Sequence, residues 1–551
     1  MDEAEGLSGG RRLAWGAAYV LATFLAFPHE LGGRVVELGW LLAWWPPALL
    51  YLAVRGLAPR RAALVGFAFG TLAHAAVWHW IWVVTVRYGQ APPWVGVLAP
   101  LLLATYPGAF MAAFAAASGW LRAPGRPPGT AAYRPPGTAA FRPLGPFALA
   151  ALWTALEHGR SFVLTGFPWA TLGYAQHENA YLLGLAPWAG VYGVGFVNAL
   201  GGFAVLEWAL RREPGRSARR ALAGLAAVLA LHAAGAAARQ PADPGARSLR
   251  IAVLQGNIDQ GVKWSRDWAE RTVEIYEELT REAAARGARL VAWPETALPG
   301  APDGDPSLEE RLASLAREAR VALVVGAVGL RFEADGELAA FYDSALVYDE
   351  RGVRLDRYDK SHLVPFGEYL PFRALLGRFI RALATGAAGR DVSAGSGPRT
   401  VPLPGRAAGE PVVSLGVPIC YELLFPDLVR RFAGGGAQVL VAITNDAWYG
   451  RTGAPHQFLA ITALRSAETG MWTARAANTG VSALIDARGQ VRERTPIFER
   501  GLLVGDVPLR DAGRAPTFYV RYGNWLPLGC WLAGVGMAAR RLRRPRQGAE
   551  A

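Results

Sequence analysis

The stretch Leu290-Val-Ala-Trp-Pro-Glu-Thr296 decides the fold of the region around it, because a short apolar run ends there in a proline and a carboxylate. Four apolar residues bounded by Pro294 predict a buried strand over 290–293. The neighbouring segments predict strands at 249–255 and 321–326 and helices at 264–287 and 307–319. Further strands are expected at 343–349, 411–420, 437–444, 472–476, 480–486 and 502–507, with a helix at 455–469. Strands that alternate with helices, with paired strands between them, predict α/β layers with mixed sheets over 249–510.

The rest of the chain has the composition of a membrane protein. Of its 551 residues, 52% are hydrophobic and only 18% are charged, and about 20 apolar residues are enough to cross a bilayer as a helix. Eight such stretches lie near 12–28, 37–54, 62–83, 93–121, 146–166, 183–210, 218–238 and 519–538. We therefore expect a membrane domain of seven transmembrane helices at 1–238, an eighth helix at 519–538, and a basic cytoplasmic tail at 539–551.

Arginine marks one side of these spans. Arginine clusters precede the first span and follow the second, fourth, sixth and eighth, and they all fall on one side if both termini are cytoplasmic. The 249–510 domain then faces the outside of the membrane. The net charge of +13 could suggest a nucleic-acid partner. We expect none, because arginines that flank spans contact anionic headgroups and no nucleic-acid motif accompanies them.

Lysine and cysteine are rare in this chain, which makes their positions informative. The only lysines are Lys263 and Lys360, and the only cysteines are Cys420 and Cys530. Two cysteines cannot support a disulfide framework, and Cys530 lies inside the last span, where a small packing residue is the simplest interpretation. Lys360 and Cys420 both lie in segments with other polar residues, so they are candidates for chemistry.

Three segments place a reactive side chain at the end of an expected strand. Glu295 follows the 290–293 strand, Lys360 lies in Tyr358-Asp-Lys-Ser-His-Leu-Val-Pro-Phe-Gly-Glu368, and Cys420 lies in Val417-Pro-Ile-Cys-Tyr-Glu422. Ligands bind beyond the carboxyl ends of strands in open α/β sheets. A thiol needs a base or a positive field before it attacks, so Glu295 is the candidate base and the Lys360 ammonium the electrostatic partner of the Cys420 nucleophile. Taken singly, each residue is more often a core cysteine, a loop glutamate or a surface lysine.

These segments resemble the carbon–nitrogen hydrolase (nitrilase) superfamily, which implies an αββα sandwich for 249–510. The motif Thr444-Asn-Asp-Ala-Trp-Tyr-Gly450 and the preceding spans are similar to the apolipoprotein N-acyltransferase family in particular. The resemblance extends to Leu164-Thr-Gly-Phe-Pro-Trp169, Gly184-Leu-Ala-Pro187 and Arg521-Tyr-Gly-Asn-Trp525. It therefore covers nearly the whole chain.

The resemblance implies a two-step acyl transfer in the inner membrane of a bacterium. Cys420 attacks the sn-1 ester of a phospholipid, typically phosphatidylethanolamine, and holds the fatty acid as a thioester. The N-terminal amine of a diacylglyceryl-modified apolipoprotein then takes the acyl chain. The expected partners are thus the phospholipid donor, the lipoprotein acceptor and membrane lipids, and we expect a monomer because the spans oppose the oligomers of soluble relatives.

The family pattern also suggests supporting residues. Trp264 matches a position near the substrate, Glu368 a second glutamate beside the lysine, and Tyr421 and Glu422 flank the nucleophile; each could instead be purely structural. Asp343 stands where the pattern leads us to expect asparagine, which leaves its role open.

Two further questions concern charged groups. Glu157 and Arg160 in the fifth span have i, i+3 spacing, which favours a mutual ion pair over a lipid-headgroup site. The sequence shows neither metal-ligand spacing nor a glycine-rich phosphate loop, so we expect neither a metal nor a cofactor.

The alternatives to an acyltransferase are a membrane-tethered amidase or nitrilase that uses the same three residues, and a non-enzymatic scaffold. The presence of all three of Glu295, Lys360 and Cys420 disfavours the scaffold.

Overall fold

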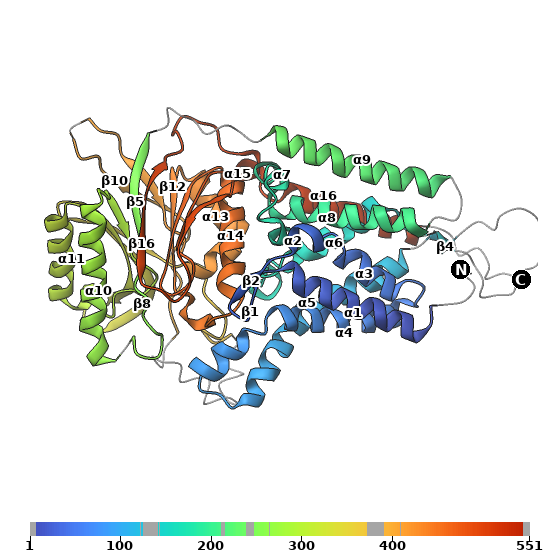
Figure 1. Cartoon of the computed structure of the whole chain (residues 1–551), viewed down its shortest axis with the longest axis horizontal. Coiled ribbons are helices and arrows are strands. Elements are labelled where there is room, and N and C mark those ends of the chain that lie inside the picture. Colours follow the sequence, from blue (N-terminus) through green and yellow to red (C-terminus); the bar gives the residue numbers. More distant parts are fainter. Residues whose placement is uncertain are drawn as a thin grey trace, which may run out of the picture. The chain divides into compact units, whose positions relative to one another are not determined.

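A computed structural model describes the chain over residues 7–121, 123–124, 141–142, 144–210, 215–238, 247–263, 265–371, 391–407 and 409–543. The chain forms two compact units (Figure 1). The helical unit comprises residues 1–239, 452–457 and 524–551, and the sheet unit comprises residues 240–451 and 458–523.

Apolar helices build the helical unit. Its longer helices are α1 (Gly9–Ala26), α3 (Pro46–Val54), α4 (Pro59–Val77), α5 (Pro93–Trp120), α6 (Pro146–Gly159), α8 (Ala186–Leu210), α9 (Arg216–Ala237) and α16 (Trp525–Leu542). Shorter elements are α2 (Gly39–Leu42), α7 (Ala180–Leu183), a π-helix (Val83–Tyr88) and the hairpin of β1 (His29–Leu31) and β2 (Arg34–Val36). Three helices of the described chain are long and apolar enough to cross a membrane, at Pro93–Trp120, Ala186–Leu210 and Ser217–Ala237.

Some expected spans are divided in the structure. The segment 37–54 forms α2 and α3 rather than one helix, because Pro46 and Pro47 occupy the first turn of α3; proline fits there but cannot continue a helix from the preceding turn. The expected span 146–166 ends as a helix at Gly159, and 62–83 ends at Val77.

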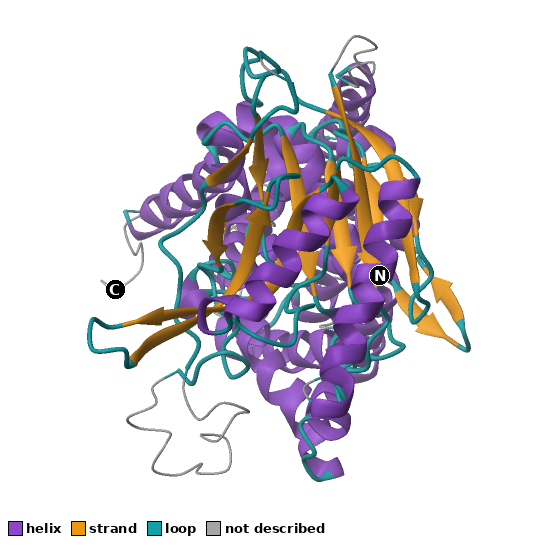
Figure 2. Ribbon diagram, turned by 90° about the vertical axis from the view of Figure 1, so that its left-hand side faces the viewer, coloured by secondary structure: helices purple, strands orange, loops and turns teal. Residues whose placement is uncertain are grey.

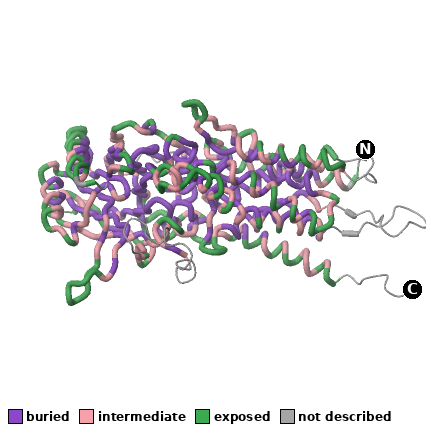
Figure 3. The backbone as a smooth tube through the Cα atoms, turned by 90° about the horizontal axis from the view of Figure 1, so that it is seen from below, coloured by how far each residue is buried: buried purple, intermediate pink, exposed green. Residues whose placement is uncertain are grey.

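Leucines on the outside of the helical unit are exposed. Exposed and buried positions alternate along its helices (Figure 3). The exposed positions include Leu13, Leu21, Leu64, Leu102, Leu229 and Leu532. Apolar side chains on several helices of one unit are typical of a surface that faces lipid.

The charged pair predicted in the fifth span is present. Arg160 Nη2 lies 3.7 Å from Glu157 Oε1, and both side chains are buried. Arg160 Nη1 also donates to His74 Nε2 at 2.8 Å, and the Leu172 N–H donates to Glu157 Oε1 at 2.8 Å. Mutual pairing therefore accounts for these two charges inside the helical unit.

Two six-stranded sheets form the sheet unit. The first has the order β16 (Gly501–Pro508), β5 (Ser248–Gln255), β6 (Leu290–Ala292), β7 (Ala322–Phe332), β8 (Leu338–Tyr348) and β9 (Arg354–Asp359). The second has the order β10 (Thr400–Leu403), β11 (Val413–Gly416), β12 (Val439–Thr444), β13 (Thr473–Ala477), β14 (Ala483–Ile485) and β15 (Val491–Arg494). In each sheet three adjacent strands are parallel, β5-β6-β7 and β11-β12-β13, and the outer strands pair antiparallel.

The two sheets lie face to face between helices. Strand β13 packs against β5, and β14 against β16. Helices α10 (Arg266–Ala285) and α11 (Pro306–Ala319) pack on the first sheet through an apolar core with Trp293 and Tyr276, and Figure 2 shows two helices in front of the strands. Helices α13 (Pro426–Gly434) and α14 (Ala454–Thr469) lie on the side of the second sheet (Figure 1). This is the αββα sandwich that the resemblance implied.

Most strands and helices expected between 249 and 510 are confirmed. Elements β10, β15 and α13 were not predicted, and the strand expected before Lys360, which is β9, was predicted without bounds. Strand β9 carries alternating charges, which hide it from a hydrophobicity pattern. In the structure its Arg354 and Arg357 pair with Asp303 at 2.6 Å each, so tertiary contacts hold a strand that its composition does not favour.

Candidate active site

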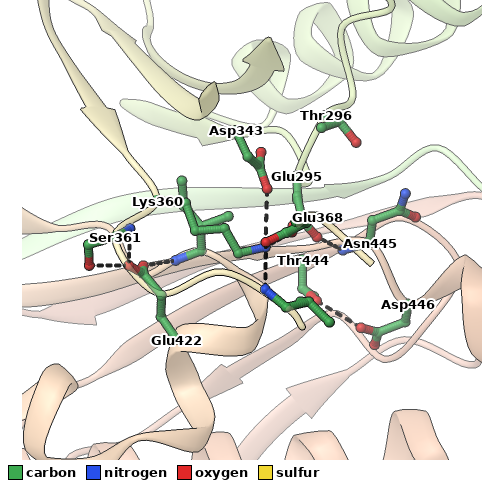
Figure 4. A network of polar contacts seen from close by, with 12 residues as sticks. Glu295, Thr296, Asp343, Lys360, Ser361, Glu368, Glu422, Thr444, Asn445 and Asp446 are labelled. Carbon is green, nitrogen blue, oxygen red and sulfur yellow. Dashed lines mark hydrogen bonds and ion pairs between the residues drawn. The ribbon is translucent and has the colours of Figure 1, made fainter. Parts of the chain in front are cut away.

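Three loops at strand ends bring Glu295, Lys360 and Cys420 together. Glu295 lies three residues beyond β6, and Lys360 directly follows β9 of the same sheet. Cys420 follows β11 of the other sheet, where Ile419 forms a parallel bridge to Ile443. The site therefore draws on both sheets. Figure 4 shows Glu295 and Lys360 beside Thr444, which ends β12 of the other sheet.

The Lys360 ammonium binds the Glu295 carboxylate directly. Lys360 Nζ lies 2.8 Å from Glu295 Oε1, and the lysine side chain has no exposed surface. The other oxygen, Oε2, accepts the backbone N–H of Asn445 at 2.7 Å. Two donors fix the orientation of this carboxylate, and one of them is a charge-assisted bond.

Two more carboxylates contact the same ammonium. Glu368 Oε1 lies 2.5 Å and Asp343 Oδ2 3.2 Å from Lys360 Nζ. Oxygens of Glu295, Asp343 and Glu368 lie within 4.8 Å of one another, a grouping that suits a cation, and the Lys360 ammonium is that cation. In the helical unit one further grouping has this spacing, Glu37, His177 and Glu178.

Cys420 lies at the start of a short 3-10 helix, Cys420–Leu424. Its φ is +46°, in the left-handed region that costs about 1–3 kcal/mol for a residue with a side chain. The side chain is buried, and the Glu295 carboxylate and Thr444 are among the neighbours that influence the pKa of its thiol. The turn therefore directs the thiol at the candidate base.

The site holds its charges in defined protonation states. Burial alone would raise the pKa of Glu295, yet the Lys360 ammonium and hydrogen bonds from Asp343, Lys360 and Cys420 lower it to about 2. Burial opposes the charge on Lys360, but Glu295, Glu368 and Asp343 raise its pKa well above the usual value. Burial and the Glu295 carboxylate raise the pKa of the Cys420 thiol well above its ordinary value. The resting site is a neutral thiol beside an ionised carboxylate, which is the arrangement required for general-base activation.

Glu422 ties the cysteine turn to the lysine loop. Its Oε1 accepts from the Tyr358 hydroxyl at 2.7 Å and from the N–H and hydroxyl of Ser361 at 2.8 and 2.7 Å. Its Oε2 accepts the Ile419 N–H at 2.8 Å. The residues on either side of the nucleophile and of the lysine thus share one buried carboxyl group, which fixes their separation.

The remaining expected residues have different outcomes. Tyr421 is buried, with its ring 5.2 Å from that of Phe425. Trp264 lies outside the described residues. Lys263, beside it, donates to Thr296 Oγ1 at 2.7 Å, and burial lowers its pKa to about 8. Both lysines of the chain therefore lie next to the Glu295 loop.

Sequence reasoning missed Asn445 as a site residue. The motif that contains it was noticed, but its contribution is a backbone N–H, which no side-chain pattern reveals. Its side chain donates to Gln260 Oε1 at 2.8 Å and accepts from Asn478 Nδ2 at 3.2 Å. These contacts hold the peptide that faces Glu295.

Comparison with known proteins gives two family matches. Residues 20–204 match the apolipoprotein N-acyltransferase N-terminal domain, and residues 250–517 match the carbon-nitrogen hydrolase family. An apolipoprotein N-acyltransferase from Geobacter metallireducens is 36% identical over 512 residues, which is 91% of each chain. The chain belongs to the apolipoprotein N-acyltransferase family.

Other relatives support the same assignment. The apolipoprotein N-acyltransferase of Azotobacter vinelandii is 34% identical over 523 residues, 92% of each chain. A solved structure of a nitrilase-superfamily amidase from Nesterenkonia is 21% identical, covers 53% of this chain and 100% of its own, and has a TM-score of 0.37. The two family matches and the identity to apolipoprotein N-acyltransferases confirm the family resemblance seen in the sequence and the nitrilase-like fold of the sheet unit, and the chain is an acyltransferase.

Proposed function

We propose that this enzyme transfers a fatty acyl chain from a phospholipid to the N-terminal amine of a diacylglyceryl-cysteine apolipoprotein, through a thioester on Cys420. The observation that carries the proposal is the buried Cys420 thiol next to a Glu295 carboxylate that binds the Lys360 ammonium at 2.8 Å. Two family matches support the proposal, the apolipoprotein N-acyltransferase N-terminal domain at residues 20–204 and the carbon-nitrogen hydrolase family at residues 250–517. The acyl donor we expect is the sn-1 ester of phosphatidylethanolamine.

In the first step, Glu295 accepts the thiol proton and the Cys420 sulfur attacks the ester carbonyl. The Lys360 ammonium, with a backbone N–H at the start of the Cys420–Leu424 helix, stabilises the negative oxygen of the tetrahedral intermediate. The carbon–oxygen bond to the glycerol then breaks, Glu295 returns the proton to the leaving oxygen, and a lysophospholipid departs. Cys420 retains the acyl chain as a thioester.

In the second step, the lipoprotein amine attacks the thioester carbonyl. Glu295 accepts a proton from the amine, the carbon–sulfur bond breaks, and the proton passes to the departing Cys420 thiolate. The product is an amide-linked, triacylated lipoprotein. Burial of Cys420 and Lys360 supports this order, because water would otherwise hydrolyse the thioester.

Other residues of the proposed site act on these three. Glu368 holds the ammonium in place, Glu422 fixes the separation of the lysine and cysteine loops, and Tyr421 shapes the acyl pocket. We place Trp264 near the substrate on the family pattern alone.

The proposal includes a location. We infer a bacterial inner-membrane protein with eight spans, seven in 1–238 and the last at 519–538, and a cytoplasmic tail at 539–551. The catalytic domain, 249–510, then faces the periplasm, where both lipid substrates meet the thiol. The arginine distribution supports this orientation, and we propose a monomer.

The test is intact-protein mass spectrometry after incubation with phosphatidylethanolamine. The wild type is expected to gain one fatty-acyl mass, which a diacylated lipopeptide then removes, whereas Cys420→Ala gains none. Cys530→Ala is the matched control, since it removes the only other cysteine and should acylate normally. An unmodified wild type that releases ammonia from a small amide would establish the amidase instead.

A further inference from the structure

Asp343 is a third carboxyl group in the site whose role the reaction above does not use. It lies on β8, and its side chain is buried among Glu295, Lys360 and Glu368. Figure 4 shows its carboxyl group directed at the Lys360 ammonium. Three carboxyl groups thus share one ammonium in the described part of the site.

Asp343 has fewer hydrogen-bond donors than the two glutamates. Glu295 accepts from Lys360 and from the Asn445 N–H at 2.8 and 2.7 Å. Glu368 accepts from Lys360 at 2.5 Å and from the Val364 N–H at 2.8 Å. Asp343 Oδ2 has only the longer 3.2 Å contact to Lys360, and Oδ1 is buried with no hydrogen-bond partner among the described residues. A carboxylate left in that state would have one buried oxygen without compensation.

The carboxyl groups of Asp343 and Glu295 also lie beside each other, with an oxygen of one within 4.8 Å of an oxygen of the other. A hydrogen bond between carboxyl groups needs a proton, and like charges this close cannot both ionise. Glu295 has the stronger donors, so the proton belongs to Asp343. Burial and the Glu295 charge raise the pKa of Asp343 well above its usual value, against the opposing effect of Lys360.

We propose that Asp343 is a positioning residue that stays protonated through the acyl transfer and donates its hydrogen bond to Glu295. This rests on the proposed function of the Glu295–Lys360–Cys420 site. The bond holds Glu295 ionised and oriented toward Cys420, and it leaves no more than two anions facing the ammonium. The charged groups around Asp343 are Glu295, Lys360, Glu368 and Lys263.

The proposal predicts the direction of two pH effects. In the folded state the Asp343 carboxyl group keeps its proton, whereas in the unfolded chain it releases this proton above about pH 4. The stability that neutral Asp343 contributes is therefore lost as pH rises through its raised pKa. Above that pH a second negative charge appears beside Glu295 and competes for Lys360, so acylation should also fall.

The first test compares Asp343→Asn with Asp343→Leu. The amide keeps a donor toward Glu295 but cannot ionise, so acyl-enzyme formation without any amine acceptor should stay within about threefold of wild type at neutral pH and should persist at alkaline pH. Asp343→Leu removes the donor, so Cys420 of this variant should be acylated at least about tenfold more slowly than in wild type, as expected for the loss of a hydrogen bond to a charged group. An Asp343→Asn enzyme that folds but is slower by about a hundredfold at every pH would mean that the carboxylate charge is required, and would overturn the proposal.

The second test observes the proton without requiring catalysis. Infrared spectra of Cys420→Ala at neutral pH, in a detergent without ester groups, should contain a carboxylic-acid carbonyl band that disappears when Asp343→Asn is added. Glu368→Gln on the same background is the control and should leave that band in place. If the band is unaffected by Asp343→Asn, Asp343 is ionised and the proposal fails. If the wild type never acylates but the band is present, the proposed function fails while the protonation of Asp343 stands.

Discussion

Replacement of Lys360 by methionine should move the pH dependence of acylation by a predictable amount. The ammonium lies 2.8 Å from the Glu295 carboxylate, so at an effective dielectric constant of about 20 their attraction is about 6 kcal/mol. Each pH unit corresponds to about 1.36 kcal/mol. Loss of the ammonium should therefore raise the pKa of Glu295 by about 4, from about 2 to about 6.

The assay is the rate of acyl-Cys420 formation, measured by quenched intact-protein mass spectrometry across the pH range. Wild type should show no acid limb above about pH 4, because Glu295 stays ionised. Lys360→Met should show a limb centred near pH 6, and its plateau should fall by about 10²–10³, the usual effect of removing an oxyanion donor.

Lys263→Met is the matched control, since Lys263 is the only other lysine. It is equally buried, and it donates to the neutral Thr296 hydroxyl at 2.7 Å and to the Glu295 backbone carbonyl at 3.5 Å. This variant should shift the acid limb by much less than Lys360→Met does. The cost of unpairing buried carboxylates is about 3–5 kcal/mol, so an unfolding temperature in detergent should accompany each measurement.

If Lys360→Met does not fold, Lys360→Arg supplies the test. It keeps the charge, so the acid limb should remain low, while the planar guanidinium displaces the compact ammonium and lowers the plateau. A folded Lys360→Met enzyme with wild-type pH dependence and a plateau within about threefold of wild type would refute this account of the site.

Three other substitutions have defined expectations. In Gly326→Ala, the added Cβ would lie 2.1 Å from the Pro294 carbonyl oxygen, so the Glu295 loop must shift. Acylation should fall by about a hundredfold, as expected for a small misplacement of a reacting group. A normal acylation rate would show that the loop is free to move. Arg475→Met leaves Asp446, its fully buried partner at 3.0 Å, unpaired, and should cost about 3–5 kcal/mol of stability, measured by denaturant unfolding in detergent. The pKa of Lys263 is about 8 in the folded protein and about 10.4 in the unfolded chain, so folding releases a proton between these pH values. Wild type should therefore gain stability relative to Lys263→Met as pH rises through this window, and the gain should be lost as pH falls through about 8. Parallel stability curves for the two proteins would contradict this.

Much of the site could be read from the sequence because its chemistry depends on rare residue types at strand ends. Glu295 and Cys420 each follow an apolar run, and Lys360 and Cys420 belong to residue types that this chain hardly uses. Glu368 and Glu422 were found through the family pattern, and the structure adds their contacts to Lys360 and to the loop residues Tyr358 and Ser361.

The fold was predictable where burial controls composition. The strands β5, β6, β7 and β12 are nearly all apolar because both of their faces are covered, and such runs carry a strong local signal. Strand β9 carried no such signal, because it contains charged residues whose arginines form ion pairs with acidic residues distant in sequence. The second expected span was wrong as one helix, since apolarity shows a segment's environment but not where prolines divide it.

The sequence by itself determined the family and the reaction class and predicted the three candidate reacting residues, because these depend on which side chains are present and in what order. Only the tertiary structure decided the protonation states of the candidate site residues and the hydrogen-bond donors that surround them. The backbone N–H of Asn445 on Glu295, the four donors on Glu422 and the third carboxyl group at Lys360 come from segments far apart in the chain. Protonation depends on burial and on distances of a few ångströms between such groups, and those distances exist only once the strands have come together.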